Sequence, residues 1–419
     1  MAKLDELINQ YADEINAKVI AWRRDFHQNP ELGNQEFRTS KIVADHLRAI
    51  GVDEVYEGCA GGTGVLGVIK GALPGPTVGL RADMDALPIK EDTGLPYAST
   101  KTATWGDQGT VPVMHACGHD MHTAMLMGAA EVIVRCKEEL NGRVLLVFQP
   151  AEEGCASDWE GKSGAARFIE DPHYIANRPD VMFGQHIWYF APRDTAGMLG
   201  VIPGMVGYCM DIVRITIKGI SAHGNRPWMG RDSIKAAAHI ITALQTIPSG
   251  TTDIYKNSVS VTMGMIKGGT KFNVVADTTV IEGALRFTDR TQRDYLEERF
   301  TEIVTKTAEA LGCTAEIKMT WVPGLYNDPE VLEKTQKNLD ELFGKGVFTT
   351  RADLSFANLD DYSWYTEGCP GLFYGLSIAW PSDDPHETIT NHNPKFDPNE
   401  AAMLNGVKAL AGSALKWAK

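Results

Sequence analysis

The stretch that decides the fold is TVGLRADMD at Thr77–Asp85, a short apolar run that ends in two aspartates. Two further runs have the same form. Val144–Phe148 ends shortly before Glu152–Glu153, and Val181–Phe183 continues into His186. Helical patterns lie between these runs, and alternation of strand and helix predicts a largely parallel sheet with helices on both faces. Ligands bind such sheets at the carboxyl ends of the strands, where these polar residues stand.

The middle of the chain has a different order of predicted elements: strand, helix, two strands, helix, strand. The predicted elements are Asp211–Lys218, Asp232–Ile247, Ser258–Lys267, Thr278–Phe287, Thr291–Leu311 and Thr314–Thr320. This order is the split βαβ arrangement of a ferredoxin-like α+β domain. After Pro323–Gly324 the first pattern returns, with a buried strand at Gly371–Trp380. We expect an inserted domain over residues 206–320 and a discontinuous α/β catalytic domain of residues 1–205 and 321–419.

Composition narrows the class of protein. With 419 residues, 43% of them hydrophobic, the chain can form two domains with substantial cores. The formal net charge of -14 argues against a nucleic-acid partner, which normally requires a basic face. No apolar stretch approaches the roughly 20 residues of a membrane span. Scattered cysteines and an amino terminus without a basic and apolar leader predict a reducing, cytoplasmic location.

The run MHACGHDMH at Met114–His122 combines three histidines, a cysteine and an aspartate. Imidazole, thiolate and carboxylate are ligands that zinc and manganese accept, so the run predicts part of a metal site. Cys117 and His119 are spaced to reach one ion, although a buried cysteine taken alone is more often an inert small hydrophobe. His122 is expected to hydrogen-bond a ligand.

The acidic pair Glu152–Glu153 follows a predicted strand end and precedes Gly154. One carboxylate could bind metal while the other moves protons as a general base. The alternative is a solvated acidic turn, the usual fate of such pairs. We favour the functional interpretation because the pair occurs together with histidines at other strand ends.

Four motifs together resemble those of the M20 metallopeptidase family. They are RADMDALP at residues 81–88, HACGHD at 115–120, FQPAEEG at 148–154 and HNPKFD at 392–397. The similarity covers nearly the whole chain, starting with RRDFH at 23–27 and PEL at 30–32. The nearest branch is the amidohydrolase group of hippurate hydrolases, N-acyl amino acid amidohydrolases and auxin-conjugate hydrolases.

The resemblance implies roles for individual residues. The metal ligands would be Cys117, His119, Glu153, His186 and His392. Glu152 would be the general base, and Asp85 would orient a ligand imidazole. The inserted domain would be a lid that dimerises and closes on the substrate, with His223 reaching a neighbouring active site to polarise the scissile group. Asn273 and Arg286 match positions that hold a substrate carboxylate, a group that suits the planar guanidinium; a surface salt bridge is the alternative for Arg286.

Departures from the family pattern bear on the substrate. Gln185 stands where an apolar residue is usual, and Trp228 stands where a second histidine is frequent. The aromatic residues Trp188–Phe190, together with Trp228 and Trp380, could form a flat pocket for an aryl group. The alternative is that they belong to the core or to a dimer interface.

We therefore expect a metal-dependent hydrolase that cleaves a C–N bond of a small carboxylate-bearing substrate, above all the amide of an N-acyl or N-aroyl amino acid. The resemblance implies one or two divalent ions; zinc or manganese is favoured, while cobalt, nickel and iron remain open. A homodimer through the lid is expected. The alternatives are hydrolytic deamination of an aromatic amine such as a nitro-aminobenzoate, and a non-catalytic protein that kept the metal-site fold. Retention of both Glu152 and Glu153 disfavours the second, because a binding protein needs no base.

Overall fold

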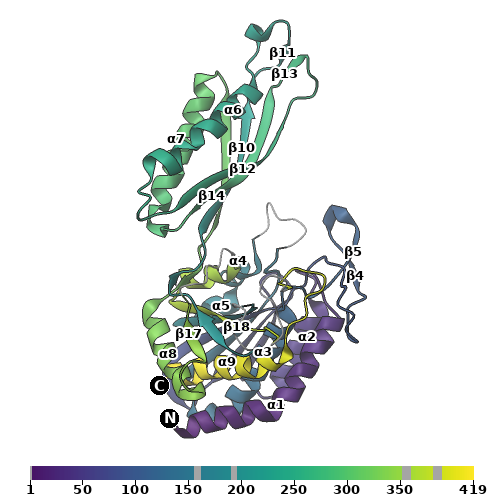
Figure 1. Ribbon diagram of the computed structural model, residues 1–419, viewed down its shortest axis with the longest axis vertical. Helices are drawn as coiled ribbons and strands as arrows, with labels where there is room; N and C mark the ends of the chain where they lie inside the picture. The colour runs from purple at the N-terminus through teal and green to yellow at the C-terminus, as the bar shows by residue number, and fades with distance from the viewer. Residues whose placement is uncertain (1, 155–161, 190–195, 352–359, 381–388) are drawn as a thin grey trace. The chain divides into compact units, whose positions relative to one another are not determined.

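The computed structural model describes residues 2–154, 162–189, 196–351, 360–380 and 389–419. Contacts within the chain divide it into two compact units (Figure 1). Unit 1 contains the described residues up to 206 and from 326 onward, and unit 2 contains residues 207–325. The role of unit 2 as a dimerising lid stays a proposal.

Unit 1 is built on an eight-stranded mixed sheet with the strand order β1-β2-β6-β3-β7-β18-β8-β17. The strands are β1 Glu54–Cys59, β2 Gly64–Lys70, β3 Leu73–Asp83, β6 Asn141–Gln149, β7 Val181–Trp188, β8 Leu199–Val201, β17 Phe348–Thr350 and β18 Gly371–Ser377. The central strands β6, β3, β7 and β18 are parallel. Parallel strands are buried on both faces, which accounts for their near-continuous apolar runs. The expected α/β fold with a mostly parallel sheet is confirmed.

Helices cover both faces of this sheet (Figure 1). One face carries α3 His119–Arg135 and α9 Met403–Trp417, with α1 Ala2–Gln28 packed against both. The other face carries α4 Gly164–Phe168 and η6 Asp361–Glu367. Further elements of unit 1 are α2 Phe37–Ala49, α5 Pro172–Ala176, α8 Pro329–Phe343, and the short strand pairs β4 Thr102–Thr104 with β5 Thr110–Pro112 and β9 Gly204–Met205 with β16 Tyr326–Asn327.

Unit 2 has the element order β10, α6, β12, β14, α7, β15 and a four-stranded antiparallel sheet of order β12-β14-β10-β15. The elements are β10 Cys209–Lys218, α6 Ser233–Leu244, β12 Val259–Gly268, β14 Thr278–Phe287, α7 Arg293–Ala310 and β15 Thr314–Val322. Between them, β11 Ala222–His223 pairs with β13 Val274–Val275. Helices α6 and α7 pack on each other and on the sheet. Both the order and the connectivity are those of a split βαβ domain.

Two predicted boundaries were wrong, and each has a physical reason. The helical pattern of the sequence predicts a helix over Thr123–Leu140 that stops at Asn141–Gly142. Helix α3 instead begins at His119, four residues earlier, because Gly118 adopts a left-handed conformation (φ 97°) that starts the helix there. It ends at Arg135 and is followed by a 3-10 turn over Lys137–Glu139, and Gly142 lies inside β6. Strand β7 extends to Trp188, so His186 lies within the strand instead of beyond it.

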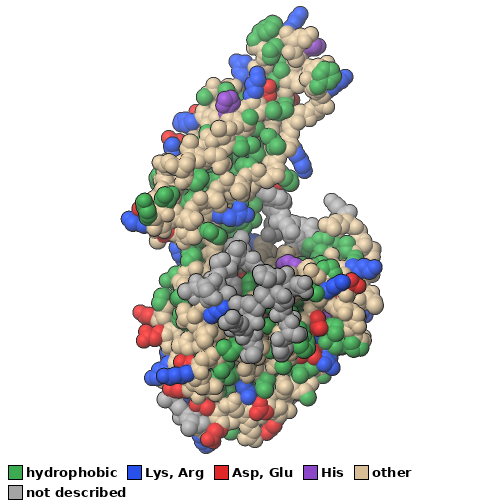
Figure 2. Space-filling view, viewed as in Figure 1, with side chains coloured by type: hydrophobic (Ala, Val, Ile, Leu, Met, Phe, Trp, Pro, Cys, Tyr) green, Lys and Arg blue, Asp and Glu red, His purple; other side chains and the backbone are tan. Residues whose placement is uncertain are grey.

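The face of the molecule drawn in Figure 2 carries side chains of both charge signs. Acidic and basic side chains are interspersed among the described residues on the face drawn in Figure 2. None of the described helices combines the length and the apolar character that crossing a membrane requires.

Candidate metal centre

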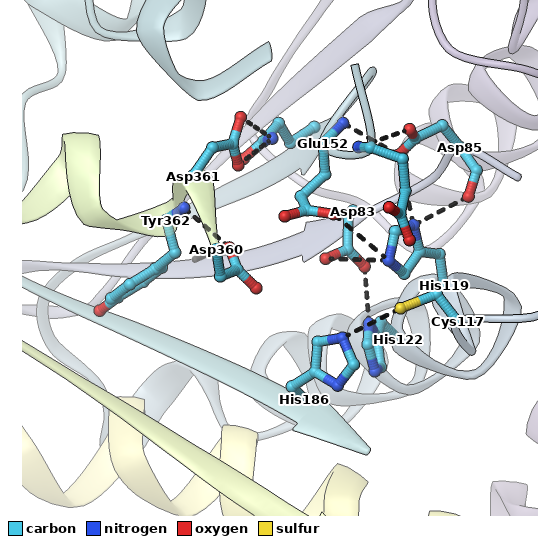
Figure 3. A network of polar contacts seen from close by, with 12 residues as sticks. Asp83, Asp85, Cys117, His119, His122, Glu152, His186, Asp360, Asp361 and Tyr362 are labelled. Carbon is cyan, nitrogen blue, oxygen red and sulfur yellow. Dashed lines mark hydrogen bonds and ion pairs between the residues drawn. The ribbon is translucent and has the colours of Figure 1, made fainter. Parts of the chain in front are cut away.

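The five residues expected to bind metal lie together in unit 1. Figure 3 labels three of them, Cys117, His119 and His186. Cys117, His119 and His186 offer ligand atoms within 4.8 Å of one another, and so do Cys117, Glu153 and His392. The Cys117 thiol lies at the centre of the group. Its Sγ is 3.5 Å from Nε2 of His186 and 3.3 Å from Nε2 of His392. The structure therefore brings these residues together from the start of α3, the end of β6, strand β7 and a loop near the carboxyl terminus.

Backbone carbonyls fix the ring orientation of two histidines in this group. Nδ1 of His119 is 2.8 Å from the carbonyl oxygen of Asp85, and Nδ1 of His186 is 2.6 Å from the carbonyl oxygen of Ile187. A carbonyl can only accept, so each Nδ1 carries a proton, and Nε2 is left as the ring nitrogen that can bind an ion. This arrangement is typical of metal-binding imidazoles.

His392 reaches the group because its loop is attached to the Ala116–Cys117 backbone. The His392 N–H donates to the carbonyl of Ala116 at 2.7 Å, and the Asn391 side-chain amide donates to the carbonyl of Cys117 at 2.8 Å. His392 itself has a left-handed backbone (φ 67°), which is strained for a residue with a Cβ. Its Nε2 lies 2.9 Å from a carboxylate oxygen of Glu153.

Asp85 holds the acidic pair through the backbone. Its two carboxylate oxygens accept the N–H groups of Glu152 at 3.1 Å and of Glu153 at 3.0 Å. One of these oxygens also lies 3.3 Å from Nδ1 of His119. Asp85 is buried, so these bonds act in a low-dielectric environment where they are strong. One aspartate thus orients an imidazole and the loop that carries both glutamates.

The donor set fits a divalent cation. Nε2 of His119 is buried and has no hydrogen-bond partner among the described residues, although it faces acidic and thiol groups. Burial lowers the pKa of His119, but the nearby Asp83 and Cys117 raise it by more, so the net pKa lies well above the usual range. The site therefore favours a positive charge at this nitrogen. One thiol, three imidazoles and a carboxylate are a set that zinc and manganese accept.

Both ring nitrogens of His122 are engaged in hydrogen bonds within the protein, one of them with Asp83. Nδ1 of His122 donates to the Asp83 carboxylate at 2.6 Å, and its Nε2 accepts the N–H of Ile187 at 2.9 Å. Both ring nitrogens are therefore occupied. The bond to Ile187 ties α3 to β7 next to His186.

Sequence reasoning missed a buried charge network behind Glu152. The Arg81 guanidinium donates to Asp83 at 2.7 Å and to Asp361 at 2.9 Å, and lies 3.1 Å from Asp360. The carboxylates of Glu152, Asp360 and Asp361 lie within 4.8 Å of one another (Figure 3). A signal was present, because an arginine inside an apolar strand is buried only when carboxylates pair with it.

The electrostatics separate the two glutamates. Burial raises the pKa of Glu152, and the nearby Asp360 and Glu153 carboxylates raise it further, well above its usual range. Burial also raises the pKa of Glu153, but its hydrogen bond with His392 and the proximity of His119 outweigh this, so the net direction is down. Glu153 is thus held as a carboxylate, whereas Glu152 can take up a proton.

Gln185 is not brought to the site, which corrects the expectation that it lines the substrate pocket. Neighbouring residues of a strand point to opposite faces. His186 faces Cys117, whereas the Gln185 amide donates to Sδ of Met125 in α3 at 3.5 Å. Because β7 continues through His186, Gln185 lies in the core under α3 and α9.

The predicted catalytic residue His223 and the remaining predicted substrate-binding residues belong to unit 2. His223 is exposed in β11, where its Nδ1 accepts the N–H of Asn225 at 3.0 Å, and Trp228 is 72% exposed. Asn273 has a buried Oδ1 without a partner among the described residues. Arg286 donates to the Thr262 hydroxyl at 3.0 Å and forms no ion pair within the described part of the chain. Their roles stay predictions.

The aromatic residues of unit 1 have mixed positions. The Trp188 ring contacts the His186 ring edge-on, with centroids 5.5 Å apart, and Tyr189 contacts Phe396. The Trp380 indole N–H donates to the carbonyl of Asp397. Phe190 lies outside the described residues. An aryl pocket stays a proposal.

Comparisons with known proteins agree with this geometry. Residues 79–416 match the family described as Peptidase family M20/M25/M40. The chain is 33% identical over 401 residues to an N-acetyl-L-cysteine deacetylase of Bacillus subtilis (strain 168), covering 96% of this chain and 88% of the relative. It is 33% identical over 407 residues to IAA-amino acid hydrolase ILR1-like 2 of Arabidopsis thaliana, covering 96% and 85%. The crystal structure of the Bacillus subtilis YXEP protein, described as a dinuclear metal-binding peptidase from the M20 family, superposes with a TM-score of 0.75 at 30% identity, covering 97% of this chain and 99% of the other. With the clusters described above, these relatives support a divalent metal at the site.

Proposed function

The chain belongs to peptidase family M20/M25/M40, and from this premise we propose that it is a metal-dependent amidohydrolase that hydrolyses the amide bond of small N-acyl amino acids. One observation carries the proposal. The Cys117 thiol lies within 3.5 Å of the Nε2 atoms of His186 and His392, with Glu152 and Glu153 beside them. Relatives named as an N-acetyl-L-cysteine deacetylase and an IAA-amino acid hydrolase support the substrate class.

We propose that Cys117, His119, Glu153, His186 and His392 hold the metal. A divalent ion held there supplies Lewis acidity, which polarises a carbonyl and makes water acidic enough to react near neutral pH. The mixed thiol, imidazole and carboxylate set suits zinc or manganese. The number of ions, one or two, is part of the proposal.

Glu152 is the proposed general base. Its carboxylate lies 3.8 Å from Nε2 of His119, so it is close to the proposed metal without being needed as a ligand. Burial and the neighbouring Asp360 carboxylate raise the pKa of Glu152, so this carboxyl takes up a proton more readily than an exposed glutamate does. A group that takes a proton from water and returns it to the leaving amine needs this property.

Residues of unit 2 complete the proposal. His223 would stabilise the negative charge that develops on the scissile carbonyl oxygen, acting across a homodimer formed through unit 2. Arg286 and Asn273 would bind the substrate carboxylate, since a guanidinium fork matches a carboxylate and the Asn273 Oδ1 has no partner among the described residues. The exposed Trp228 is the proposed contact for an aryl group.

The test is a panel of N-acyl amino acids assayed with metal-free protein to which manganese, zinc or cobalt is restored. We expect release of the free amino acid with at least one metal and none without metal. Aminobenzoates in the same panel cover the alternative reaction. Hydrolysis of aminobenzoates alone, or full amide hydrolysis by verified metal-free protein, would contradict the proposal.

A further inference from the structure

A buried glutamate outside the proposed metal set touches the loop that carries Glu152 and Glu153. Glu36 precedes α2 and its side chain is wholly buried. One of its oxygens accepts the N–H of Ala151 at 2.9 Å, and the other accepts the hydroxyl of Thr63 at 2.6 Å. The bond therefore ends on the residue immediately before the two glutamates.

Ala151 has a conformation that needs such support. Its φ is 48°, in the left-handed region that residues with a Cβ rarely adopt, and such a residue costs on the order of 1–3 kcal/mol unless its surroundings hold it. Ala151 opens the irregular turn after β6. If it relaxed to an ordinary conformation, the side chains of Glu152 and Glu153 would point elsewhere.

Three successive N–H groups of this turn are held by two buried carboxyl groups. Glu36 accepts the N–H of Ala151, and Asp85 accepts the N–H groups of Glu152 and Glu153. Figure 3 shows the Asp85 half of this arrangement beside His119. Because the two carboxyl groups accept from consecutive amides, removing either carboxyl group leaves part of the turn without its hydrogen-bond acceptor.

The segment before Glu36 packs tightly against the same turn. A Cβ added to Gly33 would lie 2.3 Å from the carbonyl oxygen of Gly154 and 3.2 Å from Cα of Ala151. The backbone at Gly33 therefore approaches the turn as closely as a residue without a side chain permits. Glu36 and Gly33 belong to one segment of the chain, and both contact the turn at Ala151.

We propose that Glu36 is a positioning residue for the hydrolysis, acting through the Ala151 N–H to hold Glu153 in place for the metal and Glu152 in place for proton transfer. This inference rests on the proposed function. Glu36 touches neither glutamate side chain and donates no group to the reaction. Its contribution is a hydrogen-bond acceptor at one fixed point of the turn.

The acceptor role makes a sharp prediction for the isostere. In Glu36→Gln the side-chain carbonyl still accepts the Ala151 N–H, and the amide can donate to the Thr63 oxygen. Burial and the nearby Asp85 carboxylate raise the pKa of Glu36 to about 7, so the neutral carboxyl, which glutamine mimics, is populated near neutral pH. Glu36→Ala removes the acceptor and leaves the N–H buried without a partner.

The experiment measures kcat, KM and Mn²⁺ affinity for Glu36→Ala, Glu36→Gln and a matched control, Glu31→Ala. The Glu31 carboxylate accepts the N–H groups of Arg38 and Thr39 at the start of α2 but does not touch the turn. We expect Glu36→Ala to lower kcat and Mn²⁺ affinity by about 10- to 100-fold, the usual cost of losing an outer-sphere support, with KM within about threefold. Glu36→Gln and Glu31→Ala should stay within about threefold of wild type in all three quantities.

Two results would overturn the proposal: equal losses in Glu36→Ala and Glu31→Ala, or a loss in Glu36→Gln as large as in Glu36→Ala. If Glu36→Ala does not fold, Gly33→Ala tests the same turn by crowding it and should lower kcat and Mn²⁺ affinity in the same way. Titration of metal-free protein with Mn²⁺ needs no substrate. If wild-type protein hydrolyses no N-acyl amino acid, the proposed function fails, and the Mn²⁺ affinities of the variants still decide the role of Glu36.

Discussion

Asp85→Asn should be far more harmful than an isosteric change usually is. Both Asp85 oxygens accept backbone N–H groups, from Glu152 at 3.1 Å and Glu153 at 3.0 Å. Asparagine has only one carbonyl oxygen. Whichever way its amide turns, one N–H of the turn loses its acceptor and faces an NH₂ group. Glu36 differs, because only one of its oxygens accepts a backbone N–H while the other meets a hydroxyl.

The magnitude follows from that count. Leaving one buried donor without a partner costs about 1–3 kcal/mol. Tenfold in an equilibrium or rate constant corresponds to about 1.4 kcal/mol, so the variant should lose about 5- to 150-fold in metal affinity and in kcat together. We expect the loss to appear in metal binding and turnover because Asp85 also lies beside Nδ1 of the proposed ligand His119.

The assay combines Mn²⁺ titration of metal-free protein with steady-state hydrolysis of an N-acetyl amino acid. Asp45→Asn serves as the control, since the exposed Asp45 pairs only with neighbouring helix residues. If Asp85→Asn bound Mn²⁺ and turned over within about twofold of the control, the two backbone hydrogen bonds would not hold the turn, and the reasoning would be refuted.

Three further predictions concern other parts of the chain. Glu152→Gln should still bind metal and substrate but lower kcat by about 10²-fold or more, because it removes the base and keeps the shape; loss of bound metal in this variant would show that the roles of Glu152 and Glu153 are exchanged. Mixed dimers of inactive His223→Ala and inactive Glu152→Gln chains should regain activity, since one composite site then carries both intact groups, whereas a fully active monomer would contradict action across the dimer. Burial and Glu297 raise the pKa of Asp211 in β10 to about 7. The folded state therefore keeps a proton that the unfolded state has lost, and the free energy of unfolding should decrease as the pH rises from about 4 to about 7, by up to about 1.4 kcal/mol per pH unit. Asp211→Asn should flatten this slope in thermal unfolding measured from pH 4 to 8; an unchanged slope would mean that other groups cause it.

The sequence predicted the sheet and the order of elements in unit 2 because both depend on local patterns. Apolar runs such as Val144–Phe148 mark buried parallel strands, and polar residues after them mark the strand ends where ligands bind. The family resemblance added the roles that spacing alone leaves open. The family membership is confirmed by the match over residues 79–416, and the residue roles stay predictions.

Other features depend on contacts between distant segments and could not be read from local patterns. Gln185 faces α3 because β7 continues to Trp188. This could not be predicted, because a short apolar run does not show where a strand ends. Asp360 and Asp361 stand 279 and 280 positions from Arg81, so only the fold brings them together. The same holds for Glu36, whose partner Ala151 is 115 positions away.

The most direct test of the central claim is anomalous X-ray diffraction from crystals grown with Mn²⁺ or Zn²⁺, recorded on both sides of the absorption edge of the metal. The account predicts an anomalous peak bonded to side chains of the proposed set, Cys117, His119, Glu153, His186 and His392, and its loss in a His119→Ala variant. A fully folded protein that shows no peak at these side chains, or shows its metal elsewhere while hydrolysing N-acyl amino acids, would contradict the account.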